Sequence, residues 1–246
     1  DYGSYPFVTS SDPSIRGLAN GVGLSEKDVD LAISLVKMFY MNRVGEGPFP
    51  TELGGTASAE WCKNHTREEE EAQYAGATVN DSDPFRQGVG IRRAGNEYGA
   101  TTGRPRRAGW LDLPLLRAAV AVNGPHIFPT KIDVLDGCEE ICICTGYVYK
   151  GPERNLGFTK LHPGQPLEVA IMDADVLAHC EPVYETVPGW MTDISGITRY
   201  GDLPPEVRRP LRFVEQQTGT TSVGLSVGAE RPQTILRRNT AIGKYI

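Results

Sequence analysis

The sequence predicts an α/β protein with a mixed, largely parallel sheet flanked by helices. Short apolar segments of strand length alternate along the chain with segments whose apolar residues recur at helical spacing. Hydroxyl-rich, glycine-rich or charged segments follow several apolar runs, as expected where ligands bind at the carboxyl ends of strands. With 246 residues, 39% of them hydrophobic and 23% charged, the chain can bury the core of such a globular domain.

The charge balance and the cysteines limit the classes of function. A net charge of -6 argues against a nucleic-acid-binding protein, which needs a basic surface. No apolar run is long enough to cross a bilayer, so we expect no membrane partner. The five cysteines contain no CxxC pair, and Cys142 and Cys144 would face opposite sides of a strand. We therefore expect reduced thiols, no zinc site and a cytoplasmic location.

The first 41 residues are predicted to contain a strand and a helix. An apolar run at 5–8 ends in hydroxyl residues that begin with Thr9, which is typical of a strand that leads to a ligand. Further on, Ser25 and Asp28 form a capping-box pattern. Apolar residues at helical spacing follow and predict a helix that ends near Met41. They are Val29, Ile33, Val36 and Tyr40.

Residues 54–93 differ in composition from the rest of the chain. They carry four consecutive glutamates, at 68–71, and show little apolar periodicity. We interpret this segment as a surface insertion with one acidic helix at 66–74. The glutamates could instead form a metal site, but a solvated helix face is the more common arrangement of such a charge run, so no metal ligand is predicted here.

The second half of the chain alternates strands and helices. We expect a helix at 111–122, with Leu115, Leu116, Ala119 and Val120 facing inward, and a second helix within 203–218 that Gly219 ends. The predicted strands or extended segments lie at 126–129, 142–149, 167–171, 182–190, 221–227 and 234–236, the last of them closing the sheet.

The segment GNEYGATTGRPRRAGWLD, residues 95–112, is the strongest candidate for a binding site. Thr101 and Thr102 precede Gly103 and three arginines. Glycines allow backbone N–H groups to converge on an anion, and guanidinium groups bind carboxylate or phosphate oxygens in pairs. We predict a loop that holds a small anionic substrate; the alternative is a basic surface turn capped by Pro105. The arginines are Arg104, Arg106 and Arg107.

A second candidate site is TKID at 130–133, after the predicted strand at 126–129. Many GTP-binding proteins use such an element, because its aspartate accepts hydrogen bonds from the ring N–H and the amino group of guanine. Adenine offers no such pair of donors. The stem of Lys131 can pack along the base, and residues 226–228 could supply N–H groups to the guanine oxygen. The alternative is that Asp133 and Asp136 are turn-forming residues.

The histidines and the glycine patterns predict no further site. The four histidines share no metal-binding spacing, and no GxxxxGK[ST] phosphate loop is present. We therefore take the histidines to be structural or surface residues.

Six blocks of the sequence together resemble the carboxyl-terminal half of adenylosuccinate synthetases, in that family's order. They are YPFVTSS, VGEGPFPTEL, GNEYGATTGRPRRAGWLD, TKIDVLDG, EPVYETVPGW and GAERPQTI. The resemblance covers nearly the whole chain. It implies a P-loop-NTPase-like synthetase fold, of which residues 1–246 would be the carboxyl-terminal part of a single domain.

The resemblance also implies a reaction and its partners. The family uses GTP and Mg²⁺ to join IMP and L-aspartate, forming adenylosuccinate, GDP and phosphate on the route to AMP. The 6-oxygen of IMP first takes the γ-phosphoryl group, and the aspartate amine then displaces that phosphate. The family's enzymes are homodimers.

Roles for individual residues follow from the same resemblance. Thr9 and Arg104 would bind IMP, Thr101 and Thr102 would hold the carboxylates of aspartate, and Arg106 would reach GTP. The matching substrate loop consists of Ala100, Thr101, Thr102, Gly103, Arg104, Pro105 and Arg106. The matching GTP-binding residues are Arg106, Lys131, Ile132, Asp133, Ser226, Val227 and Gly228.

The chain departs from the family pattern in two places besides the long 54–93 segment. The family's amino-terminal portion has no counterpart here. That portion holds the phosphate loop GDEGKGK, the general base and general acid, the Mg²⁺ ligands and the arginine that a partner subunit donates. We therefore expect no catalytic residue and no metal ligand in this chain. Pro105 stands where the family usually has arginine, which removes one charge and one N–H. The alternatives are a non-catalytic guanine-nucleotide-binding module and a structural interaction fragment.

Overall fold

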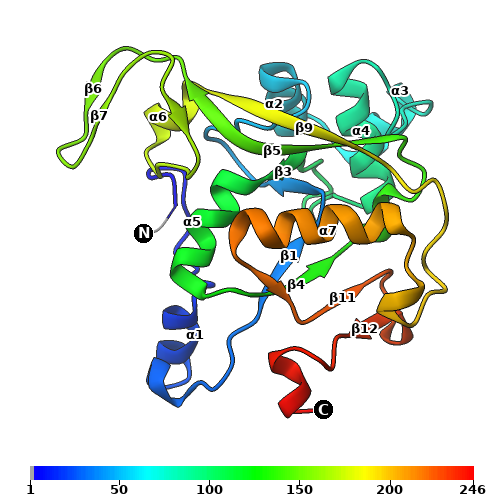
Figure 1. Ribbon diagram of the computed structural model, residues 1–246. Helices are drawn as coiled ribbons and strands as arrows, with labels where there is room; N and C mark the ends of the chain where they lie inside the picture. The colour runs from blue at the N-terminus through cyan, green and yellow to red at the C-terminus, as the bar shows by residue number, and fades with distance from the viewer. Residues whose placement is uncertain (1–2) are drawn as a thin grey trace.

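A computed structural model, which describes residues 3–246, confirms the mixed α/β class (Figure 1). Three strands form a parallel sheet in the order β1 (Ser34–Lys37), β4 (His126–Thr130) and β10 (Thr221–Ser222). The carboxyl ends of β1 and β4 therefore lie at the same edge of the sheet. Helices α5 (Leu113–Asn123) and α7 (Pro205–Thr218) lie in front of it in this view and pack against each other.

A second sheet lies above the first and combines both pairing directions. Its order is β2 (Tyr40–Arg43), β3 (Arg107–Asp112), β5 (Glu140–Tyr149) and β8 (Pro166–Leu167), and β9 (Cys180–Pro188) also pairs with β5. Strands β3 and β5 are parallel, and the other pairs are antiparallel. The hairpin of β6 (Arg154–Asn155) and β7 (Lys160–Leu161) projects to one side (Figure 1).

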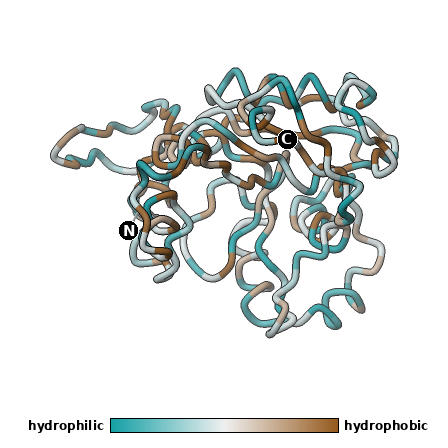
Figure 2. The backbone as a smooth tube through the Cα atoms, turned by 90° about the horizontal axis from the view of Figure 1, so that it is seen from below, coloured by the Kyte–Doolittle hydropathy of each residue, from teal (hydrophilic) through white to brown (hydrophobic). Residues whose placement is uncertain are grey.

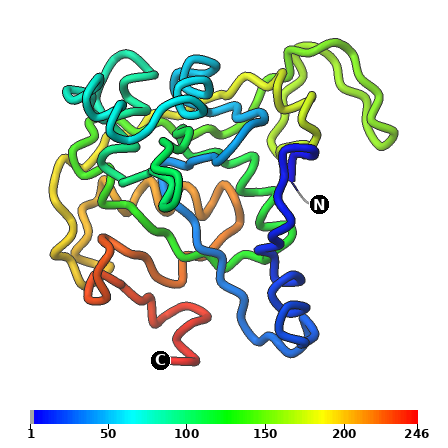
Figure 3. Tube along the Cα trace, turned by 180° about the vertical axis from the view of Figure 1, so that it is seen from behind, coloured from blue at the N-terminus to red at the C-terminus, as the bar shows by residue number. Residues whose placement is uncertain are grey.

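Seen from behind, the amino-terminal and carboxyl-terminal segments lie in different parts of the molecule (Figure 3). The segment with α1 (Ile15–Gly21) runs down one side, and the carboxyl-terminal residues lie at the bottom, away from helices α2 to α4. In Figure 2 the hydrophobic parts of the trace lie mostly where sheets and helices pack, and many outer turns are hydrophilic. The main core therefore joins both sheets and α7, and includes Phe39, Ile127 and Val214.

Several predicted elements are confirmed. Strands β4, β5, β9 and β12 (Thr234–Leu236) and helices α5 and α7 lie where the sequence placed them, within a few residues. Gly219 ends α7 with a φ of 66°, a left-handed conformation that glycine adopts without strain because it has no Cβ. In α5, Leu116 is buried but Ala119 is exposed, so the predicted inward face was partly wrong.

The predicted helix before Met41 is wrong. The capping box of Ser25 and Asp28 is present, but it begins only a single 3-10 turn, Glu26–Asp28. The chain then forms β1 and β2, separated by Met38 and Phe39. Both side chains are fully buried, and pairing of β1 with β4 overrides the helical spacing of the apolar residues.

Three predicted strands differ from the structure. Residues 5–8 form turns, because Phe7 and Val8 donate their N–H groups to Ser4 and Pro6 of the same segment. Only the first residue of the predicted 167–171 strand belongs to β8. The 221–227 strand is divided into β10 and β11 (Gly224–Ser226), and β11 pairs with β12 in a separate antiparallel sheet. Strand β12 therefore does not close the main sheet.

Residues 54–93 contain three helices where the sequence predicted one. The acidic helix is confirmed as α3 (Arg67–Gln73), which begins with a capping box of Thr66 and Glu69. Helices α2 (Gly55–Asn64) and α4 (Pro84–Gly95) were missed. Helix α4 buries Ile91 in the main core, and a Cβ added to its Gly90 would lie 2.1 Å from the carbonyl carbon of Thr78. Buried glycines in place of apolar side chains hide its helical periodicity.

Candidate functional site

The predicted substrate loop is a tight turn closed by its own backbone. Gly99 donates its N–H to the oxygen of Arg104 at 2.8 Å, and Gly103 donates to the oxygen of Gly99 at 2.9 Å. Gly103 has a φ of +63°, a conformation that glycine adopts without strain. Thr101, Thr102 and Arg104 are exposed at the tip. The loop therefore presents two hydroxyls and one guanidinium to solvent on a fixed base.

The loop lines a cavity of about 630 Å³ between it, the 43–47 turn and α2. Thr102, Arg104 and Arg106 all border this cavity, whereas Thr101 does not. The buried Pro105 also lines it and pairs with Tyr98 below the loop. The cavity therefore has a cationic wall of a kind that carboxylate or phosphate groups bind.

Arg107, the third arginine of the segment, does not belong to this cationic group. Its side chain is buried and donates to both oxygens of Glu52, at 2.9 and 2.6 Å. It also donates to the carbonyl oxygens of Gly45 and Gly47. Arg107 is thus neutralised, and its role is to hold the 45–47 turn that forms the opposite wall of the cavity.

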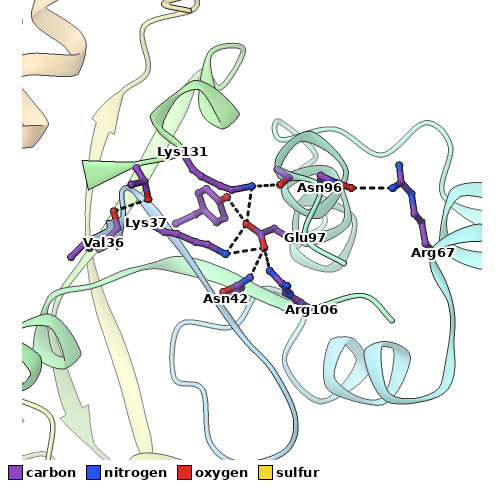
Figure 4. A network of polar contacts seen from close by, with 11 residues as sticks. Val36, Lys37, Asn42, Arg67, Asn96, Glu97, Arg106 and Lys131 are labelled. Carbon is purple, nitrogen blue, oxygen red and sulfur yellow. Dashed lines mark hydrogen bonds and ion pairs between the residues drawn. The ribbon is translucent and has the colours of Figure 1, made fainter. Parts of the chain in front are cut away.

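A buried carboxylate that the sequence did not single out, Glu97, lies at the centre of the site (Figure 4). Its side chain is 0% exposed and accepts hydrogen bonds from four side chains. The donors are Lys37 Nζ at 2.8 Å to both oxygens, Tyr40 Oη at 2.7 Å, Asn42 Nδ2 at 2.5 Å and Arg106 Nη1 at 3.0 Å. The Nζ atom of Lys131 lies 3.6 Å from the same carboxylate.

These contacts determine the charge state of the cluster. Burial raises the pKa of Glu97, but the hydrogen bonds of Lys37 and Tyr40 and the charges of Lys37 and Lys131 outweigh it, so the pKa lies below its ordinary value. Burial lowers the pKa of Lys37, and Glu97 opposes this change. Glu97 is therefore ionised at neutral pH. The sequence feature that could have identified Glu97 is its position as an isolated acidic residue just before the arginine loop.

The TKID segment lies at the carboxyl end of β4, as the sequence predicted. Lys131 adopts a left-handed backbone, with φ of 59°, and donates to the carbonyl oxygen of Gly95 at 2.5 Å. Burial raises the pKa of Asp133, although Lys131 opposes the change. Asp136 instead accepts from Trp190 Nε1 at 2.7 Å and from the N–H of Ile194 at 3.1 Å. The side chain of Asp136 thus anchors the segment after β9 through long-range contacts, which the turn-forming alternative did not predict.

The second predicted guanine segment, residues 226–228, begins with the last residue of β11, a strand that packs against β4. Val227 and Ile132 both have buried side chains in the main core. The N–H of Val227 already donates to the oxygen of Gln233 at 3.0 Å. Within residues 3–246 the N–H of Gly228 makes no hydrogen bond, so this amide is the better candidate donor for a ligand.

Thr9 lies apart from the arginine loop. It is exposed and borders a different cavity, of about 450 Å³, beside α5. Arg43 lines both cavities, and its Nη2 atom donates to Ser4 Oγ and to the oxygen of Phe7. The described residues therefore do not bring Thr9 and Arg104 into one pocket, although Arg43 connects the two.

The described part of the chain offers no metal centre. Among residues 3–246, no three His, Cys, Asp or Glu side chains are grouped closely enough to hold an ion. The glutamates of α3 do not form such a group, since Glu70 is buried against Arg92. None of the helices in this range is long and apolar enough to cross a membrane.

The fold and site define an α/β protein that gathers cationic side chains around a buried carboxylate at the end of a parallel sheet. The sequence model of the adenylosuccinate synthetase family matches residues 1–235. The chain belongs to the adenylosuccinate synthetase family.

Curated relatives and a solved structure agree with this assignment. The chain is 40% identical over 238 residues to the adenylosuccinate synthetase of Halothermothrix orenii, covering 96% of this chain and 45% of that protein. It is 39% identical over 240 residues to that of Geobacter sulfurreducens, covering 97% and 45%. The fully ligated adenylosuccinate synthetase of Plasmodium falciparum superposes with a TM-score of 0.71 at 32% identity, over 96% and 47%. The chain thus spans about half the length of the curated relatives it matches.

Proposed function

We propose that this chain is the carboxyl-terminal part of a GTP-dependent ligase that joins IMP and L-aspartate to form adenylosuccinate. One observation carries the proposal: Glu97 contacts both Arg106 of the loop and Lys131 of the TKID segment. An anion-binding loop and a candidate guanine site therefore share one ionic cluster. A ligase that uses GTP to activate one substrate toward another needs two such sites close together.

The residues of this chain bind and orient the reactants in this proposal. Thr101, Thr102 and Arg104 at the exposed tip hold the carboxylates of aspartate, and Arg104 also contacts IMP. Arg106 and Asp133 bind GTP, with Thr9 contributing to IMP from the neighbouring cavity. Ala100 and Gly103 complete the loop, and Gly228 donates to the guanine oxygen.

The reaction itself depends on groups that we place outside these residues. The 6-oxygen of IMP attacks the γ-phosphorus of GTP, GDP leaves, and the amine of aspartate then displaces the phosphate at C6. The general base, the general acid and the Mg²⁺ ligands belong to the amino-terminal portion of the family. The proposal also includes a homodimer in the cytoplasm.

The test measures adenylosuccinate formation by the intact gene product from IMP, aspartate and either GTP or ITP. ITP lacks the 2-amino group, so the ratio of kcat/KM values isolates one hydrogen bond to Asp133. A hydrogen bond to a charged group contributes about 1.5–3 kcal/mol, which is roughly a 10- to 150-fold preference for GTP. Asp133→Asn should remove most of this preference. The control is Asp136→Asn, which should retain it, because the carboxylate of Asp136 faces Trp190.

A second variant tests the loop. Arg104→Leu should raise the KM for aspartate or IMP at least tenfold, because a charge-assisted contact is lost. Kinetics equal to those of the unaltered protein would refute the loop assignment. The alternative of a non-catalytic guanine-nucleotide-binding module predicts GTP binding without any adenylosuccinate. The alternative of a structural interaction fragment predicts neither.

A further inference from the structure

We propose that Glu97 is a positioning residue that couples the binding of nucleotide to the binding of aspartate. The inference rests on the proposed function, because it assigns a role to the carboxylate between the two proposed sites. The side chain of Glu97 is completely buried, so it acts through Arg106 and Lys131 (Figure 4). It is therefore not a catalytic residue.

The first argument is that Glu97 fixes Arg106 in two ways. Its main-chain oxygen accepts the N–H of Arg106 at 2.9 Å, and its carboxylate accepts Nη1 at 3.0 Å. Since Gly99 N–H also bonds to the oxygen of Arg104, the two arms of the loop are tied to each other beside Glu97. Any movement of Glu97 is therefore transmitted to the loop.

The second argument is the exposure of the two cations. The carboxylate of Glu97 is completely buried, whereas the side chains of Arg106 and Lys131 are 34% and 40% exposed. Each cation therefore extends from the buried anion to a surface that a ligand can reach. A self-contained structural ion pair is different: Glu70 and Arg92 in this protein are both 0% exposed.

The third argument is the charge of the cluster. Lys37, Arg106 and Lys131 supply three positive charges against the negative charges of Glu97 and the nearby Asp133, which leaves an excess of one (three minus two). The Nε atom of Arg106 is also buried without a hydrogen-bond partner. The cluster is thus incompletely neutralised, and binding of an anion at either cation strengthens it.

The two binding sites are coupled because Lys131 and Arg106 contact the same carboxylate. A nucleotide whose base packs along Lys131 restricts that side chain, and with it the carboxylate and Arg106. Aspartate then meets a loop that is already ordered, so less entropy is lost on binding. Because coupling is reciprocal, aspartate raises the affinity for nucleotide by the same factor.

The experiment uses the intact gene product with IMP and GDP, a mixture in which no phosphoryl transfer occurs. Aspartate affinity is measured by calorimetry with and without saturating GDP. We expect GDP to increase it at least fivefold in the unaltered protein, and Glu97→Gln to reduce that factor to nearly one. The matched control is Asp112→Asn, a buried carboxylate that accepts a tyrosine hydroxyl at 2.6 Å and touches neither cation. It should retain the full factor.

A second variant covers the case in which Glu97→Gln does not fold. Tyr40→Phe keeps the buried ring but removes one donor to Glu97, and it should lower the coupling at least twofold. An unaltered factor in a folded Glu97→Gln or Tyr40→Phe protein, or no GDP effect in the unaltered protein, would overturn the inference. An unaltered protein that forms no adenylosuccinate from GTP, IMP and aspartate would instead refute the proposed function.

Discussion

Replacing Glu70 by glutamine should destabilise the protein by about 3–5 kcal/mol, because it leaves the guanidinium of Arg92 buried without a counter-charge. Both side chains are 0% exposed. Glu70 accepts from Arg92 Nε at 3.1 Å and Nη2 at 2.6 Å, and from Tyr98 Oη at 2.9 Å. Arg92 Nη1 is already buried without a partner, so the guanidinium has no second acceptor to which it can turn.

The assay is urea unfolding followed by circular dichroism, together with the melting temperature. For a chain of this length, 1 kcal/mol corresponds to roughly 2–4 °C, so the melting temperature should fall by roughly 6–20 °C. A Glu70→Met, Arg92→Met double variant should recover most of the loss, since it buries no charge. A cost below about 1 kcal/mol for Glu70→Gln, or a double variant less stable than the single one, would refute the reasoning.

Three further predictions concern other buried groups. Burial raises the pKa of Asp112 from 3.8 to about 6, so the folded state binds this proton more tightly than the unfolded state does. The free energy of unfolding should therefore fall by about 3 kcal/mol as the pH rises from about 4 to 6. Urea unfolding at several pH values should show a smaller fall for Asp112→Asn. An identical fall in that variant would contradict the assignment. Of the five thiols, only that of Cys142 is not buried; a thiol reagent at pH 8 should modify at most one cysteine in the folded protein and all five in urea, and rapid modification of several would be inconsistent with this packing. Gly90→Ala should destabilise α4 by at least about 1 kcal/mol, because its Cβ would overlap the Thr78 carbonyl; an unchanged melting temperature would show that the contact relaxes freely.

The sequence predicted those elements whose local signals agree with their tertiary setting. Strand β4 is short and apolar, ends in a polar turn, and has Lys131 at its carboxyl end as expected. Helix α7 shows a clear apolar stripe and ends at Gly219. In both cases the pattern of side chains and the backbone preference indicate the same structure, so no long-range information was needed.

Helix α4 could not be predicted because its contacts depend on the absence of side chains. Gly88 and Gly90 are both buried, the first against Leu53 and the second against Thr78, and glycine normally lowers helix propensity. Any side chain at position 90 would force the backbone of Thr78 to move away. Such a reason is visible only when both partners are placed in space.

The omission of Glu97 and the wrong helix before Met41 have the same physical cause. In a helix, Lys37 and Tyr40 would lie about one turn apart, and the side chain of Asn42 would be directed elsewhere. The structure instead turns the chain between β1 and β2 at Phe39, whose φ of 71° is rare for a bulky residue. This conformation costs on the order of 1–3 kcal/mol, and burial of the Phe39 ring offsets it.

That turn brings three donors from two strands to one carboxylate. Lys37 lies at the end of β1, while Tyr40 and Asn42 lie on β2. Burying Glu97 as an anion is favourable only when such donors surround it, so the ion cluster depends on the turn at Phe39. A change that returned this segment to a helix would separate the donors, and Glu97 could no longer hold Arg106 and Lys131 together. The strained turn is therefore the structural condition for the proposed coupling between the two binding sites.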